Sequence, residues 1–298
     1  MTVELPAVAV VTRTKNRPLL FARAAASVRA QSSRDLVWVV VNDGGEAAPV
    51  EAIVDTNRAA GITCVVVHHE HSRGMEAASN AGLAAAASRY VVIHDDDDSW
   101  APDFLARTVG FLDDEPRYGG VVTGFRNVAE RVRGADVKHI TSWDARPVHG
   151  ALQMADLVRV NPFPPICFLY RRSVLDELGG YREDLPVLGD WEFNLRFLER
   201  WDIAALPDLL ANYHHRFGTA GPLGNTIHAG IDRHAAYDAL LRNEWLRRDL
   251  AAGREGLGHL LLAGRQAELL RMQWQRPLRG LRRRALLALD RLAERLGR

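Results

Sequence analysis

Short β-branched runs alternate with helical patterns through the first third of the chain, and this alternation limits the folds that the chain can adopt. Each apolar run is followed by a longer segment with helical spacing. Such alternation is typical of parallel sheets, because parallel strands need long crossovers and helices then cover the sheet. We therefore predict an α/β fold. The expected strands are residues 7–12, 36–41, 62–67 and 90–93, and the expected helices are residues 18–30, 49–59 and 74–87.

Polar residues follow each of these strands at the point where the strand ends. Because the carboxyl ends of parallel strands meet at one edge of a sheet, we expect these segments to form one functional edge. The four segments are Thr14–Arg17, Asn42–Gly45, His68–Gly74 and Asp95–Asp98.

Four consecutive aspartates, Asp95–Asp98, form the last of these segments. Carboxylates this close repel one another, so they need either full solvation or a cation among them. A solvated acidic turn is the simpler interpretation. The apolar strand before the run and Pro102 after it, which we expect to open a helix over residues 103–112, favour a ligand-binding loop instead. Mg²⁺ or Mn²⁺ is the cation that best suits these oxygen ligands.

From about residue 119 the alternation breaks, and after residue 222 the pattern is helical to the end. We predict a first domain over residues 1–217 and a helical C-terminal extension over residues 222–298. The middle of the chain is expected to hold strands at residues 119–125, 138–141, 203–206 and 209–213, an apolar run at 166–170, and helices at 172–178 and 190–200.

The composition is that of an ordinary globular protein, with 298 residues, 47% of them apolar, and a net charge of +1. Cys64 and Cys167 match no metal or redox spacing, and the first six residues lack the basic and apolar regions of a signal peptide. No apolar run approaches the roughly 20 residues that a membrane-spanning helix needs. We therefore expect a cytoplasmic protein.

The end of the chain concentrates positive charge. Residues 271–298 contain nine arginines against Asp290 and Glu294, so the remainder is net acidic. Leucines recur at spacings of three and four from Pro277 onward, which predicts an amphipathic cationic helix. Residues 277–298 are expected either to lie on an anionic surface at the inner face of the cell membrane, or to pack on protein, including a second subunit. Nucleic acid is not an expected partner, because interleaved aromatic residues are absent.

Five ordered motifs together resemble the inverting glycosyltransferases of family 2, whose nucleotide-sugar-binding domain has the GT-A fold. The resemblance covers roughly residues 7–217 and implies a Rossmann-like mixed sheet flanked by helices. The motifs are Val10–Pro18, Val41–Gly45, Asn80-Ala81-Gly82, Asp95–Asp98 with Trp100, and Gly189–Glu192 with Leu195-Arg196.

The resemblance assigns the donor nucleotide to the strand ends. The loop after the first strand touches the nucleotide through Thr14, with Arg13 and Arg17 near the phosphates, which planar guanidinium groups suit. A helix-capping role is the alternative for Asn16 and Arg17. Asp43 ends the second strand where the family binds the base or ribose, and a plain Asp-Gly turn is its alternative.

Ser79 departs from the family pattern, since many relatives carry arginine just before the residue that matches Asn80. We take Arg73 as the candidate for the missing phosphate or sugar contact. Asp96 should point away from its neighbours along an extended segment and contribute least. The donor-binding set implied by the resemblance is Thr12, Arg13, Thr14, Arg17, Asp43, Arg73, Asn80, Asp95 and Asp96.

The same resemblance implies Asp97 as a ligand of Mn²⁺ or Mg²⁺, with Asp98 close by. His215, beside His214, matches a position where some relatives place a further metal ligand or diphosphate contact. Histidine is an intermediate ligand and tolerates Mn²⁺ better than Mg²⁺. A half-buried histidine with a structural role is the alternative for each of the two.

Asp190 is the general base that the resemblance implies. It would remove a proton from the acceptor hydroxyl as that oxygen attacks the anomeric carbon, in one displacement that inverts the configuration. Glu192 is the second candidate for this role, and Trp191 lies between the two in sequence. A helix N-cap is the structural alternative for Asp190.

These residues predict a metal-dependent inverting hexosyl- or pentosyltransferase. Its donor would be a nucleoside-diphosphate sugar, with UDP as the default by family analogy, and its acceptor a hydroxyl of a growing surface glycan or a lipid-linked saccharide. A non-catalytic glycan-binding or scaffold protein with the same fold is one alternative. A sugar nucleotidyltransferase is the other, although the Gly-rich loop of that class is not present after the first strand.

Overall fold

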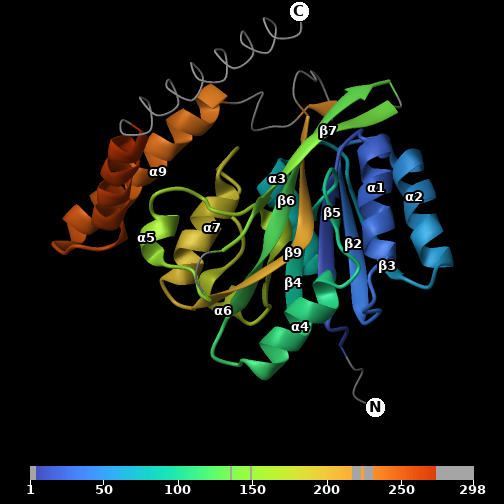
Figure 1. Ribbon diagram of the computed structural model, residues 1–298, viewed down its shortest axis with the longest axis horizontal. Helices are drawn as coiled ribbons and strands as arrows, with labels where there is room; N and C mark the ends of the chain where they lie inside the picture. Colours follow the sequence, from blue (N-terminus) through green and yellow to red (C-terminus); the bar gives the residue numbers. More distant parts are fainter. Residues whose placement is uncertain (1–4, 135, 148–149, 217–222, 225–230, 273–298) are drawn as a thin grey trace, which may run out of the picture. The chain divides into compact units, whose positions relative to one another are not determined.

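The computed structural model describes residues 5–134, 136–147, 150–216, 223–224 and 231–272. Its main feature is a mixed sheet of nine strands in the order β3-β2-β1-β4-β8-β6-β9-β5, with β7 paired to β6 (Figure 1). The strands are β1 (Val8–Thr14), β2 (Leu36–Asp43), β3 (Thr63–His69), β4 (Tyr90–Asp95), β5 (Ser99–Trp100), β6 (Gly120–Arg133), β7 (Asp136–Ala145), β8 (Phe168–Arg171) and β9 (Ile203–Arg216).

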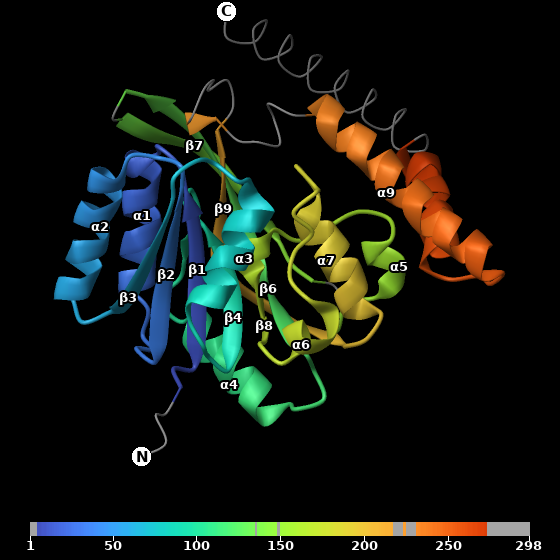
Figure 2. The ribbon, with the colours of Figure 1, turned by 180° about the vertical axis from the view of Figure 1, so that it is seen from behind.

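The first four strands are parallel and follow the predicted alternation. β1 pairs with β2 and β4, and β2 pairs with β3. Right-handed crossovers place α1 and α2 on one face of these strands and α3 on the other (Figures 1 and 2). The helices before residue 200 are α1 (Pro18–Arg29), α2 (Ala47–Ala59), α3 (Met75–Ala85), α4 (Phe104–Asp114), α5 (Met154–Leu157), α6 (Val174–Leu178) and α7 (Gly189–Leu198), with a 3-10 turn at Pro165–Cys167.

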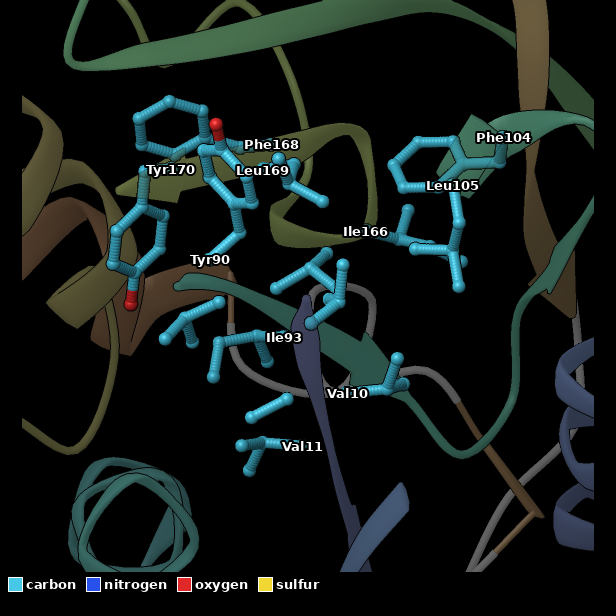
Figure 3. Packing of buried hydrophobic residues seen from close by; sticks show 14 of the residues in the cluster. Val10, Val11, Tyr90, Ile93, Phe104, Leu105, Ile166, Phe168, Leu169 and Tyr170 are labelled. Atoms are coloured by element: carbon cyan, nitrogen blue, oxygen red, sulfur yellow. The ribbon is translucent and has the colours of Figure 1, made fainter. Parts of the chain in front are cut away.

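The hydrophobic core lies around the middle of the sheet. β1 and β4 are buried on both faces, as expected for central parallel strands, and they read as nearly continuous apolar runs. Figure 3 shows Val11 and Ile93 from these strands in the same hydrophobic cluster as Phe168 and Tyr170 of β8. The core therefore fixes the strands whose ends carry the polar segments.

Two predicted elements differ from those in the structure. Pro102 does not open a helix, because α4 begins at Phe104 and Asp103 is its N-cap. Residues 203–206 and 209–213 belong to one strand, β9, which pairs with β6 through register shifts around Gly124. An irregular pairing of this kind lets one strand continue where the sequence pattern suggests a break.

The chain forms two compact units, residues 1–154 with 162–239 and residues 155–161 with 240–298. In the second unit, Arg242 donates hydrogen bonds to the carbonyl oxygens of Val158 and Leu261, both at 2.8 Å. α9 (Ile231–Ala252) and helical residues 257–272 follow the predicted helical pattern. The predicted amphipathic helix from Pro277 lies outside the described residues. No helix in the described part of the chain is both long and apolar enough to cross a membrane.

Candidate active site

The carboxyl ends of β1, β2, β3 and β4 meet at one edge of the sheet, as the alternation predicted. Thr14 pairs with Asn42, Asp43 pairs with His69, and Arg13 pairs with Asp95. The polar segments after these strands are therefore neighbours, and they supply most of the candidate site.

Arginines neutralise the first part of the Asp95–Asp98 loop. Arg13 of β1 contacts the Asp95 carboxylate, and Arg17 contacts the carboxylate of Asp96. Arg17 also reaches Asp97 Oδ2 at 3.3 Å. Four adjacent carboxylates require positive charge nearby. In the described residues, guanidinium groups supply it.

Asp96 is fully buried, which fits the expectation that it points away from its neighbours. Burial raises its pKa to about 6 and Asp97 adds to this, whereas Arg17 and a hydrogen bond from Thr14 act in the opposite direction. The Thr14 side chain is thereby tied to the acidic loop. Thr14 also lines a pocket at the end of β1, together with Asn16, Pro18, Phe21, Glu46, Pro49 and Val50.

Asp97 lies in a buried network of charges that the sequence did not reveal. Arg216, at the end of β9, contacts the Asp97 carboxylate, and Arg23 of α1 donates to the Asp97 backbone carbonyl at 2.5 Å. Glu130 of β6 joins these arginines: Arg23 Nη1 lies 3.0 and 2.8 Å from its two oxygens, and Arg216 Nη1 lies at 3.6 Å. Although burial opposes ionisation, Arg17 and Arg216 lower the pKa of Asp97.

Glu130 is the centre of this network, and His214 completes it. His214 Nδ1 lies 3.0 Å from Glu130 Oε2, and its Nε2 lies 3.0 Å from Ser99 Oγ. The His214 backbone N–H also donates to Asp98 Oδ1 at 2.8 Å. His214 therefore connects Glu130 to Ser99 through its ring and to the acidic loop through its backbone N–H. Burial raises the pKa of Asp98 well above its ordinary value.

Asp43 is held by the loop that follows β3. Its carboxylate accepts hydrogen bonds from Ser72 Oγ at 2.7 Å, from the Arg73 N–H at 2.8 Å and from the Gly74 N–H at 3.1 Å, and His69 Nδ1 lies at 2.8 Å. Burial would raise the pKa of Asp43, but these donors together lower it. Asp43 is an ionised group that fixes the loop against the end of β2.

Two members of the predicted donor set have side chains that contact other parts of the molecule. Thr12 is fully buried and accepts a hydrogen bond from Trp38 Nε1 at 2.9 Å. The Arg73 side chain is 58% exposed and lies 3.9 Å from Glu183. Arg13 Nη1, in contrast, lies 3.0 Å from Ser79 Oγ. Arg13 thus brings a guanidinium to the position where the family pattern led us to expect an arginine.

Asn80 connects α3 to the segment before α7. Its side-chain Nδ2 donates to the Tyr181 carbonyl at 2.8 Å and to Glu183 Oε1 at 2.9 Å, and its Oδ1 accepts the Tyr181 N–H at 2.9 Å. An added Cβ on Gly180 would overlap the Asn80 amide. The structure therefore places Asn80 where it holds this segment.

Asp190 lies in the first turn of α7, and Leu188 is the N-cap. The Asp190 Oδ1 accepts a hydrogen bond from the Trp191 N–H at 2.8 Å. Burial raises the pKa of Asp190 and Asp95 raises it further, whereas the Trp191 N–H, Arg13 and His234 act in the opposite direction. Asp190 is therefore within electrostatic reach of the strand-end charges.

Glu192 and Trp191 face other parts of the molecule. The Glu192 carboxylate is bound by Arg196 at 2.9 and 3.0 Å, and Arg196 also donates to the carbonyl oxygens of Leu178 and Gly180. Trp191 is almost completely buried. Arg196, held by Glu192 within α7, thus secures this helix against the preceding segment.

His215 lies in an aromatic stack near the end of β9. Its Nε2 is 2.8 Å from Asn127 Oδ1, its ring stacks on Trp143 with centroids 5.5 Å apart, and Tyr213 packs against it edge-on. In the described ranges, no three or more His, Cys, Asp or Glu side chains are grouped so that they could hold a metal ion. A Mg²⁺ ion that also binds diphosphate oxygens needs only one or two carboxylates from the protein.

The solved structures that resemble this chain define its fold class. S. aureus TarS 1-349 in complex with UDP-GlcNAc has a TM-score of 0.58 at 20% identity, covering 72% of this chain and 60% of that one. The mannosyltransferase PcManGT from Pyrobaculum calidifontis, in complex with GDP-Man and Mn²⁺, has a TM-score of 0.54 at 20% identity, covering 96% and 81%. The chain spans less than two-thirds of the TarS structure. These likenesses confirm a GT-A fold with C-terminal helices.

The chain belongs to Glycosyl transferase family 2, whose profile matches residues 9–179, more than half of its length. It is 24% identical over 268 residues to the uncharacterized glycosyltransferase YwdF of Bacillus subtilis (strain 168), covering 85% of each chain. It is 25% identical over 236 residues to the PGL/p-HBAD biosynthesis glycosyltransferase of Mycobacterium bovis BCG, covering 74% of this chain and 80% of the relative. The predicted family is therefore confirmed, and the protein is a glycosyltransferase.

Proposed function

We propose that the protein transfers a sugar from a nucleoside-diphosphate donor, with a UDP-sugar as the default, to a hydroxyl of a growing surface glycan or a lipid-linked saccharide, with inversion at the anomeric carbon. The observation that carries this proposal is a chain of contacts from the start of α7 to the strand ends: Gly189 packs on Glu76, Glu76 lies 3.9 Å from Arg13, and Arg13 contacts Asp95. These contacts support a proposed base, Asp190, beside the proposed donor site. The names of the structural relatives support a nucleotide-sugar donor, since they include UDP-GlcNAc and GDP-Man.

The donor would bind across the ends of β1, β2 and β4. Arg13 and Arg17 would face the diphosphate, because guanidinium groups match phosphate oxygens in charge and shape. The pocket beside Thr14 would take part of the nucleoside, and Asp43 would fix the adjoining loop. Arg17 already contacts two aspartates, so we expect donor binding to rearrange these ion pairs.

We propose that Asp97 is the carboxylate ligand of a divalent cation. The Asp97 side chain is 13% exposed, and the arginine contacts that the structure describes use one of its two oxygens, Oδ2. Mg²⁺ and Mn²⁺ bind one or two carboxylates and complete their shell with water and phosphate oxygens. When bound there, such an ion would stabilise the charge that develops on the departing nucleoside diphosphate. His215 is the proposed second ligand, and its Nε2 would have to give up the contact with Asn127.

Asp190 would act on the acceptor. Its carboxylate takes the proton of the acceptor hydroxyl while that oxygen bonds to the anomeric carbon and the bond from that carbon to the diphosphate oxygen breaks. A raised pKa makes Asp190 a stronger base once it is ionised. Glu192 is less suited, because its carboxylate already binds Arg196.

A thermal-shift screen tests the proposal. We expect UDP or GDP with Mn²⁺ to raise the melting temperature, because a ligand that binds only the folded state stabilises it. Release of the same nucleotide from UDP-GlcNAc or GDP-mannose would then show turnover. If neither a shift nor nucleotide release occurs with any common nucleotide sugar, the proposed function is wrong.

A further inference from the structure

Glu76 is a buried acid to which the proposed reaction gives no role. It lies in the first turn of α3 with 5% of its surface exposed. A negative side chain is favoured near a helix N-terminus even when it is exposed, so the helix does not explain the burial. Glutamate is almost never buried to this extent unless its surroundings compensate. Its neighbours should therefore show why it is there.

The Glu76 carboxyl group packs against the start of α7. The Gly189 backbone N–H hydrogen-bonds to it, and a Cβ atom added to Gly189 would overlap its carboxyl group. Leu188, just before, has a φ of 65°, a conformation that residues with side chains rarely adopt. The turn that leads into Asp190 is thus shaped around Glu76.

α3 makes a second tie to the same segment. Asn80 lies one turn after Glu76, so both side chains are on one face of the helix. Asn80 exchanges hydrogen bonds with Tyr181 at 2.8 and 2.9 Å. Asn80 therefore fixes the start of the segment that precedes Asp190, and Glu76 fixes its end.

The charged groups around Glu76 come from three other elements. Arg13 of β1 lies 3.9 Å from Glu76 Oε2 and contacts Asp95 of β4, and the charge of Asp190 on α7 also acts on Glu76. Burial, followed by Asp190 and Asp95, raises the pKa of Glu76 to about 7, although Arg13 and the Gly189 N–H oppose this. Glu76 Oε2 has no hydrogen-bond partner within the part of the chain that the structure describes. Below neutral pH, Glu76 therefore behaves as a neutral hydrogen-bonding group.

We propose that Glu76 is a positioning residue for Asp190: by packing against Gly189, the Glu76 carboxyl group fixes the first turn of α7 and so the direction in which the Asp190 carboxylate meets the acceptor hydroxyl. This inference rests on the proposed function, in which Asp190 is the base. Small displacements of a catalytic group lower kcat more than they weaken binding, because alignment matters mainly in the transition state.

Glu76→Ala and Glu76→Gln test the proposal when kcat and KM are measured for nucleotide release from UDP-GlcNAc and GDP-mannose at pH 6.5. We expect Glu76→Ala to lower kcat about 30-fold and to change KM by less than about threefold. Glu76→Gln keeps a neutral acceptor of the same size and should restore kcat to within about threefold of the wild type. Glu177→Ala, an exposed glutamate in the first turn of α6, is the matched control and should change neither constant.

A kcat for Glu76→Ala within twofold of the wild type would overturn the proposal, and so would equal losses in Glu76→Ala and Glu76→Gln. Melting temperatures of Glu76→Ala, Gly189→Ala and the double variant test the contact itself. Gly189→Ala should lower the melting temperature less when the Glu76 side chain has already been removed. Additive losses in melting temperature would contradict the contact. If the wild-type protein releases neither nucleotide, the proposed function fails and takes this role with it, whereas the melting temperatures still report on the contact.

Discussion

Two acidic pairs in this molecule, Asp97 with Glu130 and Glu76 with Asp190, are balanced in different ways. Three arginines surround the first pair. For Asp97, the arginines outweigh the effect of burial and lower the pKa. For Glu130, burial is outweighed by His214 and Arg23, which lower the pKa to about 2. Both carboxylates are therefore ionised at neutral pH. The three arginines are Arg17, Arg23 and Arg216.

Among the described residues, the second pair shares the guanidinium of Arg13, which already contacts Asp95. Burial therefore dominates, and the pKa values of Glu76 and Asp190 are both raised. The comparison shows that burial alone does not decide the charge of an acid, since the number of cations within reach does. Fixed charges suit the binding of a donor, and a carboxyl group that can take up a proton suits a base.

Asp190→Asn should have the largest effect. The amide keeps the size of the side chain but cannot accept the proton of the acceptor, so we expect sugar transfer to fall about 10³-fold. The shift in melting temperature with UDP or GDP and Mn²⁺ should remain. Asp176→Asn, an exposed acid on α6, is the control. Transfer within tenfold of the wild type would remove Asp190 from the role of base.

Glu130→Gln should break the first pair. It leaves Arg23, Arg216 and His214 without their common carboxylate, and the free energy of unfolding should fall by about 3 kcal/mol at pH 7. The wild-type pKa lies near 2, below the ordinary 4.5. The stabilisation is therefore complete above about pH 4.5 and is lost as the pH falls towards 2. Urea unfolding between pH 3 and 7 measures the loss of stability in the variant and its dependence on pH. An equal loss of stability at every pH would contradict the ionic explanation.

Glu76→Gln should change the free energy of unfolding in the opposite direction. Between its ordinary pKa of 4.5 and the raised value near 7, the folded state holds a proton that the unfolded state has released, so wild-type stability falls as the pH rises through this range. Glutamine avoids this loss, and at pH 8 the variant should be more stable by about 2 kcal/mol. At pH 4.5 the two proteins should be alike. A variant less stable than the wild type at pH 8 would mean that ionised Glu76 is well paired.

Much of the fold and part of the site could be predicted from the sequence, because both depend on local patterns. The runs that became β1, β2 and β4 are buried and apolar, that of β3 is half-buried, and the polar residues after these strands predicted the edge that carries the candidate site. The same reasoning failed at Pro102, where a favourable N1 residue lies before the true helix start. It also divided β9, since Pro207 interrupts the apolar pattern of a strand that continues.

Glu76, Glu130 and Arg23 were missed for a different reason. Each lies inside an element rather than at a strand end, and its partner is far away in sequence; Arg23 and Glu130 are 107 residues apart. A charged residue inside an apolar pattern is more often exposed than buried, so nothing local distinguishes these three. One signal was available: Gly189 directly before a proposed base indicates that another group occupies the space of its side chain.

Arg73→Ala should have the smallest effect, and it separates two sources of the phosphate contact. The Arg73 side chain is 58% exposed and lies 3.9 Å from Glu183, an arrangement worth less than about 0.5 kcal/mol. Its backbone N–H, which binds Asp43, is unchanged by the substitution. Because Arg13 already brings a guanidinium to Ser79, we expect the donor KM of Arg73→Ala to change less than twofold. A tenfold rise would instead assign the phosphate contact to Arg73, and the loop after β3 would then belong to the donor site through its side chains as well as its backbone.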